Sequence, residues 1–467
     1  MSGEKEKRVL LVVASLASFL VPYTVSSLNV ALPAISASFD IDAVTLGWVT
    51  SAYMLTAAIC IVPFGKLADL YGRKRFFIIG NVLFALGSLL AAVSWSGSVI
   101  ITARVIQALG GAMVFSTSIA IVTSVFPPGE RGRAIGIITA TVYAGLSLGP
   151  FIGGVLTQNI GWPGIFLVNI PLALLVIVLT LLYIPGEWAE TGERRFDLTG
   201  AALYSVMLFG CIYGLTLLPS LSGISWMVLG IVVLALFLWW EQRVPSPMVE
   251  IALFKKSPVF LFSNLAALIN YAVVFAVGFL LSLYLQFNRG IDPQTTGLIL
   301  IAQPVVQMII SPAAGHLSDR IEPRILATAG MACTSVGLGI LMFLSPTTPL
   351  VVIIAGLVIL GFGYGLFSSP NTNAIMSSVE VRYLGLASAM VSTMRSIGQM
   401  LSLAIAMLVF SAVIGTVRIS PEVYPELQQS VNIAFTVFFI LSLIGIAASY
   451  ARGKVRDRPD DTEIISA

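Results

Sequence analysis

The sequence predicts an all-α membrane protein, built from two six-helix bundles with a two-helix insertion between them. The chain has 467 residues, of which 57% are hydrophobic and 10% are charged, which is more apolar than a soluble protein of this length requires. Apolar stretches of about 20 residues, long enough to cross a bilayer core of about 30 Å, recur about fourteen times. A short motif after the second stretch returns after the tenth, which indicates two related halves.

The predicted spans follow one another along almost the whole chain. In order they cover residues 8–32, 43–66, 76–95, 98–123, 133–157, 163–184, 198–219, 224–240, 258–287, 294–315, 325–345, 348–370, 385–415 and 431–451. The first span follows Lys5, Lys7 and Arg8 and lacks a small-residue cleavage site. We therefore interpret it as a retained span and not as a signal peptide.

The basic residues are distributed unevenly between the two sides of these spans. Of the 25 Lys and Arg residues, 21 fall in segments that are cytoplasmic if both termini lie inside the cell. Arg289 and Arg418 fall outside, and Arg104 and Arg395 lie within spans. This asymmetry follows the positive-inside rule, and an odd number of spans would destroy it. We expect a multi-pass protein of the cell (inner) membrane with both termini cytoplasmic.

The chain divides into four expected regions. These are an N-terminal six-helix bundle at residues 1–184, two extra transmembrane helices with their linkers at 185–257, a C-terminal six-helix bundle at 258–451, and a cytoplasmic tail at 452–467. The tail is polar and charged, so we expect it to be disordered. The three cysteines have no metal or disulfide spacing, which favours a packing role.

A loop rich in glycine and charge follows the second span and returns, shortened, after the tenth. Its members are Gly65, Asp69, Gly72 and Arg73, and then Asp319 and Arg320. The loop resembles the signature of the major facilitator superfamily, which implies a transporter that works by alternating access. In such a protein Asp69 would bind Arg73 or Arg133 and face a helix N-terminus of the other half, as a latch. The alternative is a solvated loop whose charges only set the topology.

The fourth span carries a second resemblance to this superfamily. Arg104 and Gln107 match its pattern of an Arg followed by a polar residue on one helix. An Arg at membrane depth is costly unless it is partnered or hydrated, so we expect Arg104 to face a central cavity. The alternative is an Arg that extends to the outer interface.

The fifth span has a stripe of small residues. It consists of Gly145, Gly149, Pro150, Gly153 and Gly154. The stripe resembles a motif that exporters of the superfamily share, which implies export. Small residues four apart allow two helices to touch backbone to backbone, and a packing face with no bearing on direction remains the alternative.

Further stretches resemble the fourteen-span drug:H+ antiporter branch, so that the resemblance covers nearly the whole chain. They include Asn29 to Pro33, Gly161 to Pro171, and Asn371 with Arg395. The sequence departs from that branch at Thr24, where members usually carry an Asp. No Asp or Glu lies near the middle of any predicted span, although a buried carboxylate is the usual proton carrier. H+ coupling is therefore uncertain, and Thr24 becomes a candidate coupling position.

The candidate substrate surface is polar and neutral. We expect it to include Tyr53, Met113, Tyr143, Asn270, Tyr271, Gln303, Gln307, Asn371 and Asn373, beside the central residues Thr24, Asn29, Arg104, Gln107 and Arg395. For any one amide, a hydrogen bond between helices is an equally good interpretation. The two arginines would leave the cavity mildly positive, which suits neutral, anionic or amphiphilic compounds.

These observations favour a secondary transporter that exports small amphipathic or drug-like compounds. The alternatives are a lipid or lysolipid flippase, an uncoupled facilitator, and a membrane sensor or scaffold that does not transport. An enzyme is disfavoured, because the sequence has no His pair, nucleophile motif or phosphate loop. We expect no cofactor apart from possible H+ coupling, membrane lipids as neighbours, no nucleic-acid partner, and a monomer.

Overall fold

The computed structural model describes residues 2–126, 128–184, 186–187, 197–244, 253–254, 257–318, 320–379, 384–415, 417 and 419–453. These residues form helices and no β-strand. The helices are α1 (Ser2–Phe39), α2 (Ala43–Tyr71), α3 (Arg73–Ala92), α4 (Gly97–Val125), α5 (Pro128–Asn159), α6 (Pro163–Tyr183), α7 (Leu198–Leu217), α8 (Leu221–Glu241), α10 (Pro258–Val274), α11 (Val277–Leu283), the π-helix η1 (Tyr284–Asn288), α12 (Pro293–Leu300), α13 (Ala302–Ser318), α14 (Pro323–Leu341), α15 (Leu350–Ser377), α16 (Leu384–Val413), the short 3-10 helix η3 (Pro421–Val423) and α17 (Tyr424–Ala451).

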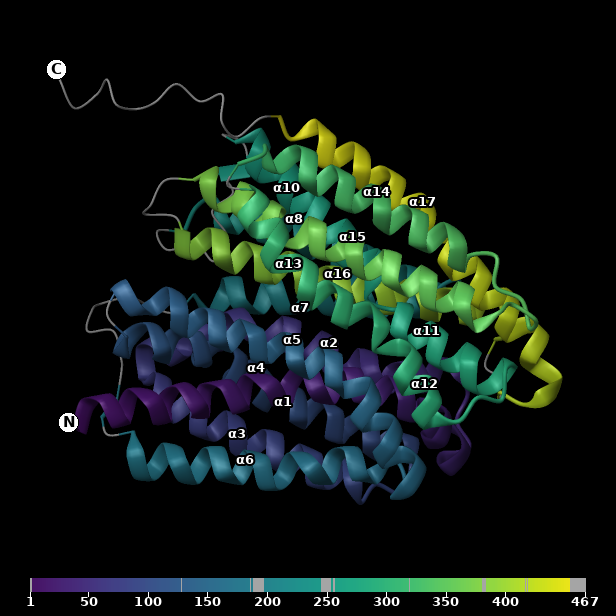
Figure 1. Cartoon of the computed structure of the whole chain (residues 1–467), viewed down its shortest axis with the longest axis horizontal. Helices are drawn as coiled ribbons and strands as arrows, with labels where there is room; N and C mark the ends of the chain where they lie inside the picture. Colours follow the sequence, from purple (N-terminus) through teal and green to yellow (C-terminus); the bar gives the residue numbers. More distant parts are fainter. Residues whose placement is uncertain are drawn as a thin grey trace.

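The described residues contain fourteen helical segments that are long and apolar enough to cross a membrane. Figure 1 shows α1 to α6 gathered in one bundle and α10 to α17 in another. The predicted fold class, two six-helix bundles with two additional helices, is confirmed. Helices of this kind are apolar on all sides because lipid or another helix surrounds them, and their backbone groups are paired internally.

Capping residues determine where several helices begin. The Asp42 carboxylate accepts hydrogen bonds from the backbone N–H groups of Val44 and Thr45, at 2.9 and 3.0 Å, and so caps α2. The Ser96 and Ser257 side chains cap α4 and α10 in the same way. Each cap satisfies an N–H group that has no partner within its own helix.

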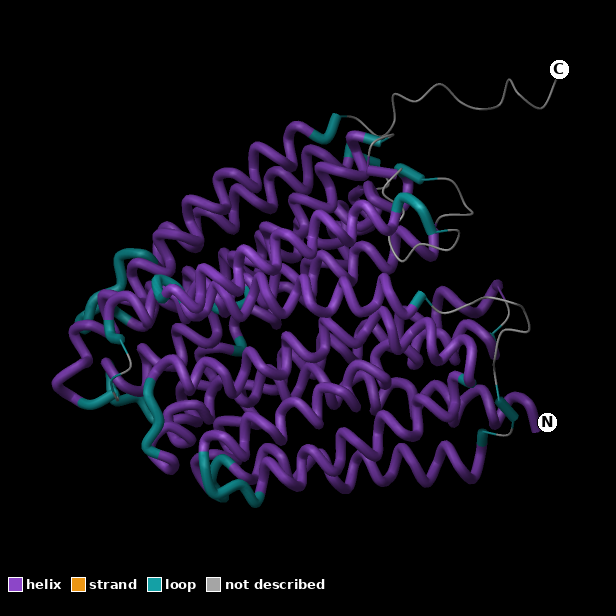
Figure 2. Tube along the Cα trace, turned by 180° about the vertical axis from the view of Figure 1, so that it is seen from behind, coloured by secondary structure: helices purple, strands orange, loops and turns teal. Residues whose placement is uncertain are grey.

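The two bundles meet at one end and diverge at the other. α1 begins and α17 ends at the same end of the molecule, called the termini end below, and the opposite end is called the distal end. Figure 2 shows the axes of the two bundles diverging toward the termini end. Near the distal end the Ser282 hydroxyl on α11 donates to the Asn29 carbonyl on α1 at 2.5 Å, and Gln286 donates to the Val30 carbonyl at 2.8 Å.

The α7–α8 hairpin packs along the line where the bundles meet. α7 contacts both α2 of the first bundle and α16 of the second. The Tyr204 hydroxyl on α7 donates to the Ala58 carbonyl on α2 at 3.3 Å. α7 and α8 approach closely at Gly210 and Gly230, where an added Cβ would meet backbone atoms at about 3 Å or less.

Two spans of the second bundle are broken near their middle. α12 ends at Leu300 and α13 begins at Ala302, and Pro304 lacks the N–H group that would pair with the Leu300 carbonyl. α10 and α11 are separated at Phe275 and Ala276, where the backbone N–H of Ala276 donates to the Ser402 hydroxyl of α16 at 2.9 Å. A side chain that enters the helical ladder in this way interrupts it.

Candidate functional site

A cavity of about 130 Å³ lies between the two bundles. The first bundle contributes Val25, Ser26, Asn29, Leu146 and Pro150, and the second contributes Tyr271, Val274, Phe275, Gly278, Leu300, Gln303, Pro304, Gln307, Tyr364 and Gln399. Both helix breaks border it, through Phe275 on one side and Pro304 on the other. Non-helical backbone at membrane depth is tolerated where it borders an internal space and not lipid, and both breaks meet this condition.

The lining is neutral but rich in amides. Of the expected residues, Asn29, Tyr271, Gln303 and Gln307 line the cavity. The Oδ1 atom of Asn29 is buried and has no hydrogen-bond partner, so it is available to a donor on a bound molecule. An amide carries both a donor and an acceptor, and the lining can therefore bind either kind of polar group.

Gln399 and Tyr364 are among the lining residues that the sequence reasoning missed. Gln399 lies one helical turn after Arg395 on α16. Because residues four apart share one face of a helix, the prediction that Arg395 faces the cavity could also have identified Gln399. Tyr364 lies in a run of glycines on α15 and forms an edge-to-face pair with Tyr271, with ring centroids 5.7 Å apart. Together with Phe275 these rings form an apolar side of the cavity.

Three other expected amides lie elsewhere, within the second bundle. Asn270 donates to the Met331 sulfur at 2.9 Å, Asn371 donates to the Ser263 carbonyl at 3.1 Å, and Asn373 donates to the Ser318 hydroxyl at 2.9 Å. None of the three lines the cavity. They differ from our expectation because each is bound to a neighbouring helix, the interpretation that the sequence left open.

Arg104 lies inside the first bundle and not at the cavity. Its side chain is fully buried, its Nε donates to the Val49 carbonyl at 3.1 Å, and its guanidinium hydrogen-bonds the Gln107 side chain. The Tyr53 ring lies beneath it, 4.2 Å from the guanidinium carbon. Our expectation that Arg104, Gln107 and Tyr53 face a central cavity is therefore not met, because α2 and α4 enclose these side chains.

Thr24 also faces the interior of the first bundle. Its hydroxyl is fully buried and lies 2.8 Å from the Leu20 carbonyl and 3.1 Å from Oδ1 of Asn169 on α6. It is not part of the cavity lining. The position where the family resemblance implied an Asp is therefore an α1–α6 contact in this structure.

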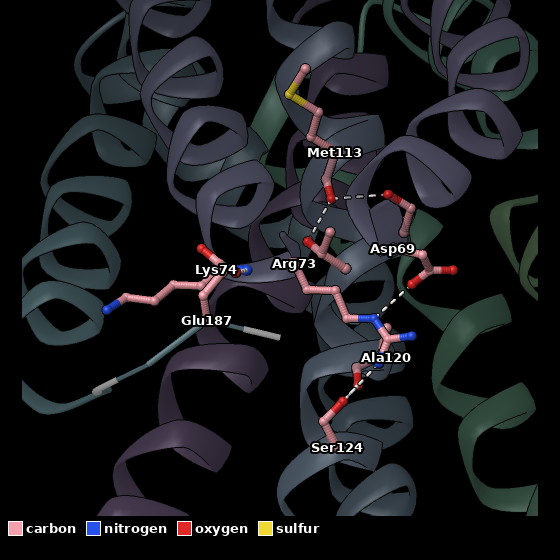
Figure 3. A network of polar contacts seen from close by, with 9 residues as sticks. Asp69, Arg73, Lys74, Met113, Ala120, Ser124 and Glu187 are labelled. Atoms are coloured by element: carbon pink, nitrogen blue, oxygen red, sulfur yellow. Dashed lines mark hydrogen bonds and ion pairs between the residues drawn. The ribbon is translucent and has the colours of Figure 1, made fainter. Parts of the chain in front are cut away.

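Neither Met113 nor Tyr143 lines the cavity. The Met113 carbonyl on α4 accepts hydrogen bonds from Ser116 and Thr117, as Figure 3 shows for the surrounding network. Tyr143 on α5 lies beside Tyr271 and Arg395 of the second bundle. It therefore bridges the two bundles on the side of the cavity that faces the termini end.

The charged loop after α2 forms a local network at the termini end (Figure 3). Arg73 donates to the Asp69 carboxylate at 2.6 Å and to the Ser124 hydroxyl of α4 at 2.7 Å. Gly72 has a φ of +116°, which only glycine adopts readily, and Gly65 has room for a side chain. Asp319 of the second motif lies outside the described residues, and Arg320 is exposed.

Glu187 is a further member of this network that the sequence reasoning missed. Its carboxylate accepts from the backbone N–H groups of Lys74 and Arg75, at 2.7 and 3.2 Å, and so caps the start of α3. The N-cap residue of α3 is Gly72, which has no side chain to accept these hydrogen bonds. The Glu187 carboxylate acts as the cap in its place.

The small residues of α5 serve two contacts. Gly145, Gly149 and Gly153 pack against α1, where added Cβ atoms would meet Phe19, Ser26 and Ser27. Gly154 and Pro150 instead touch α12 of the other bundle, at Pro293 and Gly297. Only the last part of the stripe therefore lies between the bundles.

Comparison with known proteins places these features in context. Residues 14–403 match the model of the Major Facilitator Superfamily. The riboflavin transporter RibZ of Clostridioides difficile is 32% identical over 396 residues, 84% of this chain and 86% of RibZ. The multidrug resistance protein Stp of Mycobacterium tuberculosis is 36% identical over 90% of this chain and 78% of Stp.

Solved structures agree with the fold at low sequence identity. The peptide transporter POT in complex with alafosfalin superimposes with a TM-score of 0.71 and 14% identity, covering 94% of this chain and 93% of that one. The nucleoside transporter NupG superimposes with a TM-score of 0.68 and 12% identity, covering 96% and 99%. At these identities the likeness supports the fold alone.

Proposed function

Because this chain belongs to the Major Facilitator Superfamily and is a membrane transporter, we propose that it exports small amphipathic compounds by alternating access. The observation that carries the proposal is the cavity between the two bundles. Hydrogen bonds that join the bundles lie at the distal end of the molecule, beyond this cavity. Two bundles that rock about a central site can expose that site to one side at a time.

The charge distribution supports a cytoplasmic termini end. With 21 of 25 basic residues on that side, the positive-inside rule favours insertion with both termini in the cytoplasm. In that orientation the distal end faces outward, and the conformation described here is closed on the outside. A cavity that receives compounds from the cytoplasm is what an exporter requires.

Relatives and the α5 stripe support export of drug-like compounds. Stp and the multidrug efflux pump LfrA of Mycolicibacterium smegmatis, which is 30% identical over 86% of this chain, are both named for drug resistance or efflux. The cavity has aromatic rings for an apolar body and amides for polar groups. Amphipathic compounds combine both features.

An uncoupled facilitator is the second candidate function, and one specific observation favours it. The sequence has no carboxylate near the middle of a span, and Thr24 replaces the expected Asp. A transporter without a titratable group at membrane depth has no evident site at which a proton is exchanged for substrate. We therefore propose export as the function, and the experiment below measures whether protons are exchanged for the exported compound.

The test uses the purified full chain in liposomes that contain a pH-sensitive dye. Riboflavin, the compound named for one relative, and ethidium, a drug-like cation, are added separately with and without an imposed proton gradient. Movement of either compound that exceeds protein-free liposomes supports transport, and simultaneous internal pH change supports H+ exchange. If neither these compounds nor the charged series described below move, the proposed function is wrong. Accumulation by inverted vesicles, and not by right-side-out vesicles, tests the direction.

A further inference from the structure

Arg395 occupies the approach to the cavity from the termini end. It lies on α16 four residues before Gln399, which lines the cavity, so that the two side chains share one face of the helix. Since α16 begins at the termini end, Arg395 is one turn closer to that end. Its guanidinium carbon lies 5.2 Å from the ring centre of Phe115 on α4. The side chain therefore reaches across the gap between the bundles.

Of the residues that the structure describes, those around Arg395 supply rings and hydroxyls but no anion. The hydroxyls of Tyr143 in the first bundle and Tyr364 in the second lie close enough to interact with the charge of Arg395. Among the described residues it makes no hydrogen bond and no ion pair. The acidic residues of the described spans lie at span ends, Asp69 and Glu241 at the termini ends of α2 and α8, and Glu422 and Glu426 at the distal start of the last span. Within the described part of the chain, the half-buried charge is thus compensated only by aromatic contact.

Arg104 differs from Arg395 because its Nε and Nη1 atoms are hydrogen-bonded within the first bundle, while its Nη2 atom is buried without a partner. It is fully buried, binds a backbone carbonyl and an amide, and stacks on Tyr53. Arg104 has no exposed surface and is enclosed within the first bundle, so a ligand in the cavity cannot reach it, whereas Arg395 is half-buried and lies one turn from the lining residue Gln399. Of the two arginines within spans, only Arg395 is placed to meet a substrate.

We propose that the exported compound is an amphiphilic anion whose carboxylate, sulfonate or phosphate group binds Arg395. This inference rests on the proposed function and names its substrate class. An aromatic or aliphatic body fits beside Tyr271, Phe275 and Tyr364, and neutral polar groups fit Asn29 and Gln399. A guanidinium binds such oxyanions through two parallel hydrogen bonds, which Phe115 cannot supply.

An anionic substrate also provides a driving force without a buried carboxylate. A membrane potential that is negative inside favours the outward movement of an anion. For one charge and 100 mV the effect is about a fifty-fold concentration ratio, which corresponds to about 2.3 kcal/mol. When Arg395 neutralises the bound anion, the empty carrier bears the net charge, and its inward return is favoured by the same potential. Export then proceeds as electrogenic uniport and requires no proton carrier.

The test uses three probes that share one ring system and differ in charge. They are 1-naphthoxyacetate, its neutral amide, and the cation 2-(1-naphthoxy)ethylammonium. The full chain is reconstituted on a solid-supported membrane, where charge movement is recorded as a current after rapid addition of each probe. We expect a current only for the anion, with the sign of negative charge entering the liposome. A potential imposed with potassium and valinomycin should change the anion gradient by about fifty-fold per 100 mV.

Variants assign the effect to Arg395. Arg395→Ala should reduce the anion current at least tenfold, and Arg395→Lys, which keeps the charge but not the paired geometry, should retain part of it. Arg243→Ala is the matched control, because Arg243 also stacks on a ring, Trp239 at 4.0 Å, but lies at the end of α8 outside the cavity. It should leave the current unchanged. Thermal stabilisation of the wild-type chain by the anion, and its loss in both Arg395 variants, is a second readout.

Three results would overturn the proposal. An anion current that survives Arg395→Ala, a neutral amide that binds as tightly as the anion, or a cation current larger than the anion current would each exclude it. All three leave the transport function intact. If Arg395→Ala does not fold, an unchanged anion current in Arg395→Lys together with equal binding of the amide by the wild-type chain has the same meaning.

Discussion

Gly154 on α5 and Pro293 on α12 touch across the two bundles at the distal end. A Cβ atom added to Gly154 would lie 2.5 Å from the Pro293 carbonyl oxygen. That oxygen belongs to the backbone at the start of α12 and cannot rotate away as a flexible side chain would. The neighbouring contact between Gly297 and Pro150 is equally close, so glycine on each helix allows the bundles to meet.

We predict that Gly154→Val weakens this distal contact and reduces transport at least tenfold. The readout of the contact is a cysteine introduced at Ser282→Cys in a chain without its native cysteines, because Ser282 is fully buried at the distal end. Labelling by a membrane-impermeant maleimide should increase in the Gly154→Val background. Gly136→Val is the control on the same helix, where nothing lies within 4 Å of an added Cβ. Equal labelling in both variants would contradict the prediction.

A second prediction concerns the charged loop after α2. Asp69 and Arg73 pair at 2.6 Å, with the Asp69 side chain 37% exposed, and exposed pairs of this spacing contribute only about 0.3 to 0.5 kcal/mol. Asp69→Asn should therefore leave the thermal midpoint nearly unchanged while it abolishes transport, if the loop acts as a latch. Glu187→Gln, which can still accept from the start of α3, should retain transport. Normal transport by Asp69→Asn would exclude the latch.

A third prediction separates the two arginines within spans. Arg104→Ala leaves a buried space and removes the partner of Gln107, which we expect to destabilise the chain by about 2 to 5 kcal/mol. Arg395→Ala should have a much smaller effect, because Arg395 is half-buried and lacks hydrogen bonds to the described residues. Thermal midpoints of the two purified variants in one detergent measure the difference. Equal midpoints would show that Arg104 is not the structural residue of the pair.

A fourth prediction concerns the pH dependence of the distal end. The side-chain and backbone hydrogen bonds from Thr295 hold the pKa of Asp292 below its usual range, where this carboxylate caps α12. Because the folded pKa is lowered, the stabilisation is present above about pH 4 and is lost as the pH falls through the folded pKa. The thermal midpoint of the wild-type chain should therefore approach that of Asp292→Asn as the pH falls below about 4. A difference that stays constant over that range would contradict this assignment.

The membrane architecture followed from local properties of the sequence. Fourteen apolar stretches, the position of the charges and the glycine loop are each readable within about 20 residues, because a span must satisfy its own backbone in lipid. The breaks at Ala276 and Ile301 were not predicted as such. The first depends on Ser402, which lies 126 residues away in the chain, and such a contact leaves no local trace.

Which side chains face the cavity was decided by the packing of the helices. Asn270 and Tyr271 are neighbours on α10, yet Tyr271 lines the cavity while Asn270 binds Met331 of α14 within the second bundle. A soluble helix reveals its buried face through the periodicity of its apolar residues. A transmembrane helix is apolar on every side, so its sequence defines the span, and only the neighbouring helices determine which face meets the substrate.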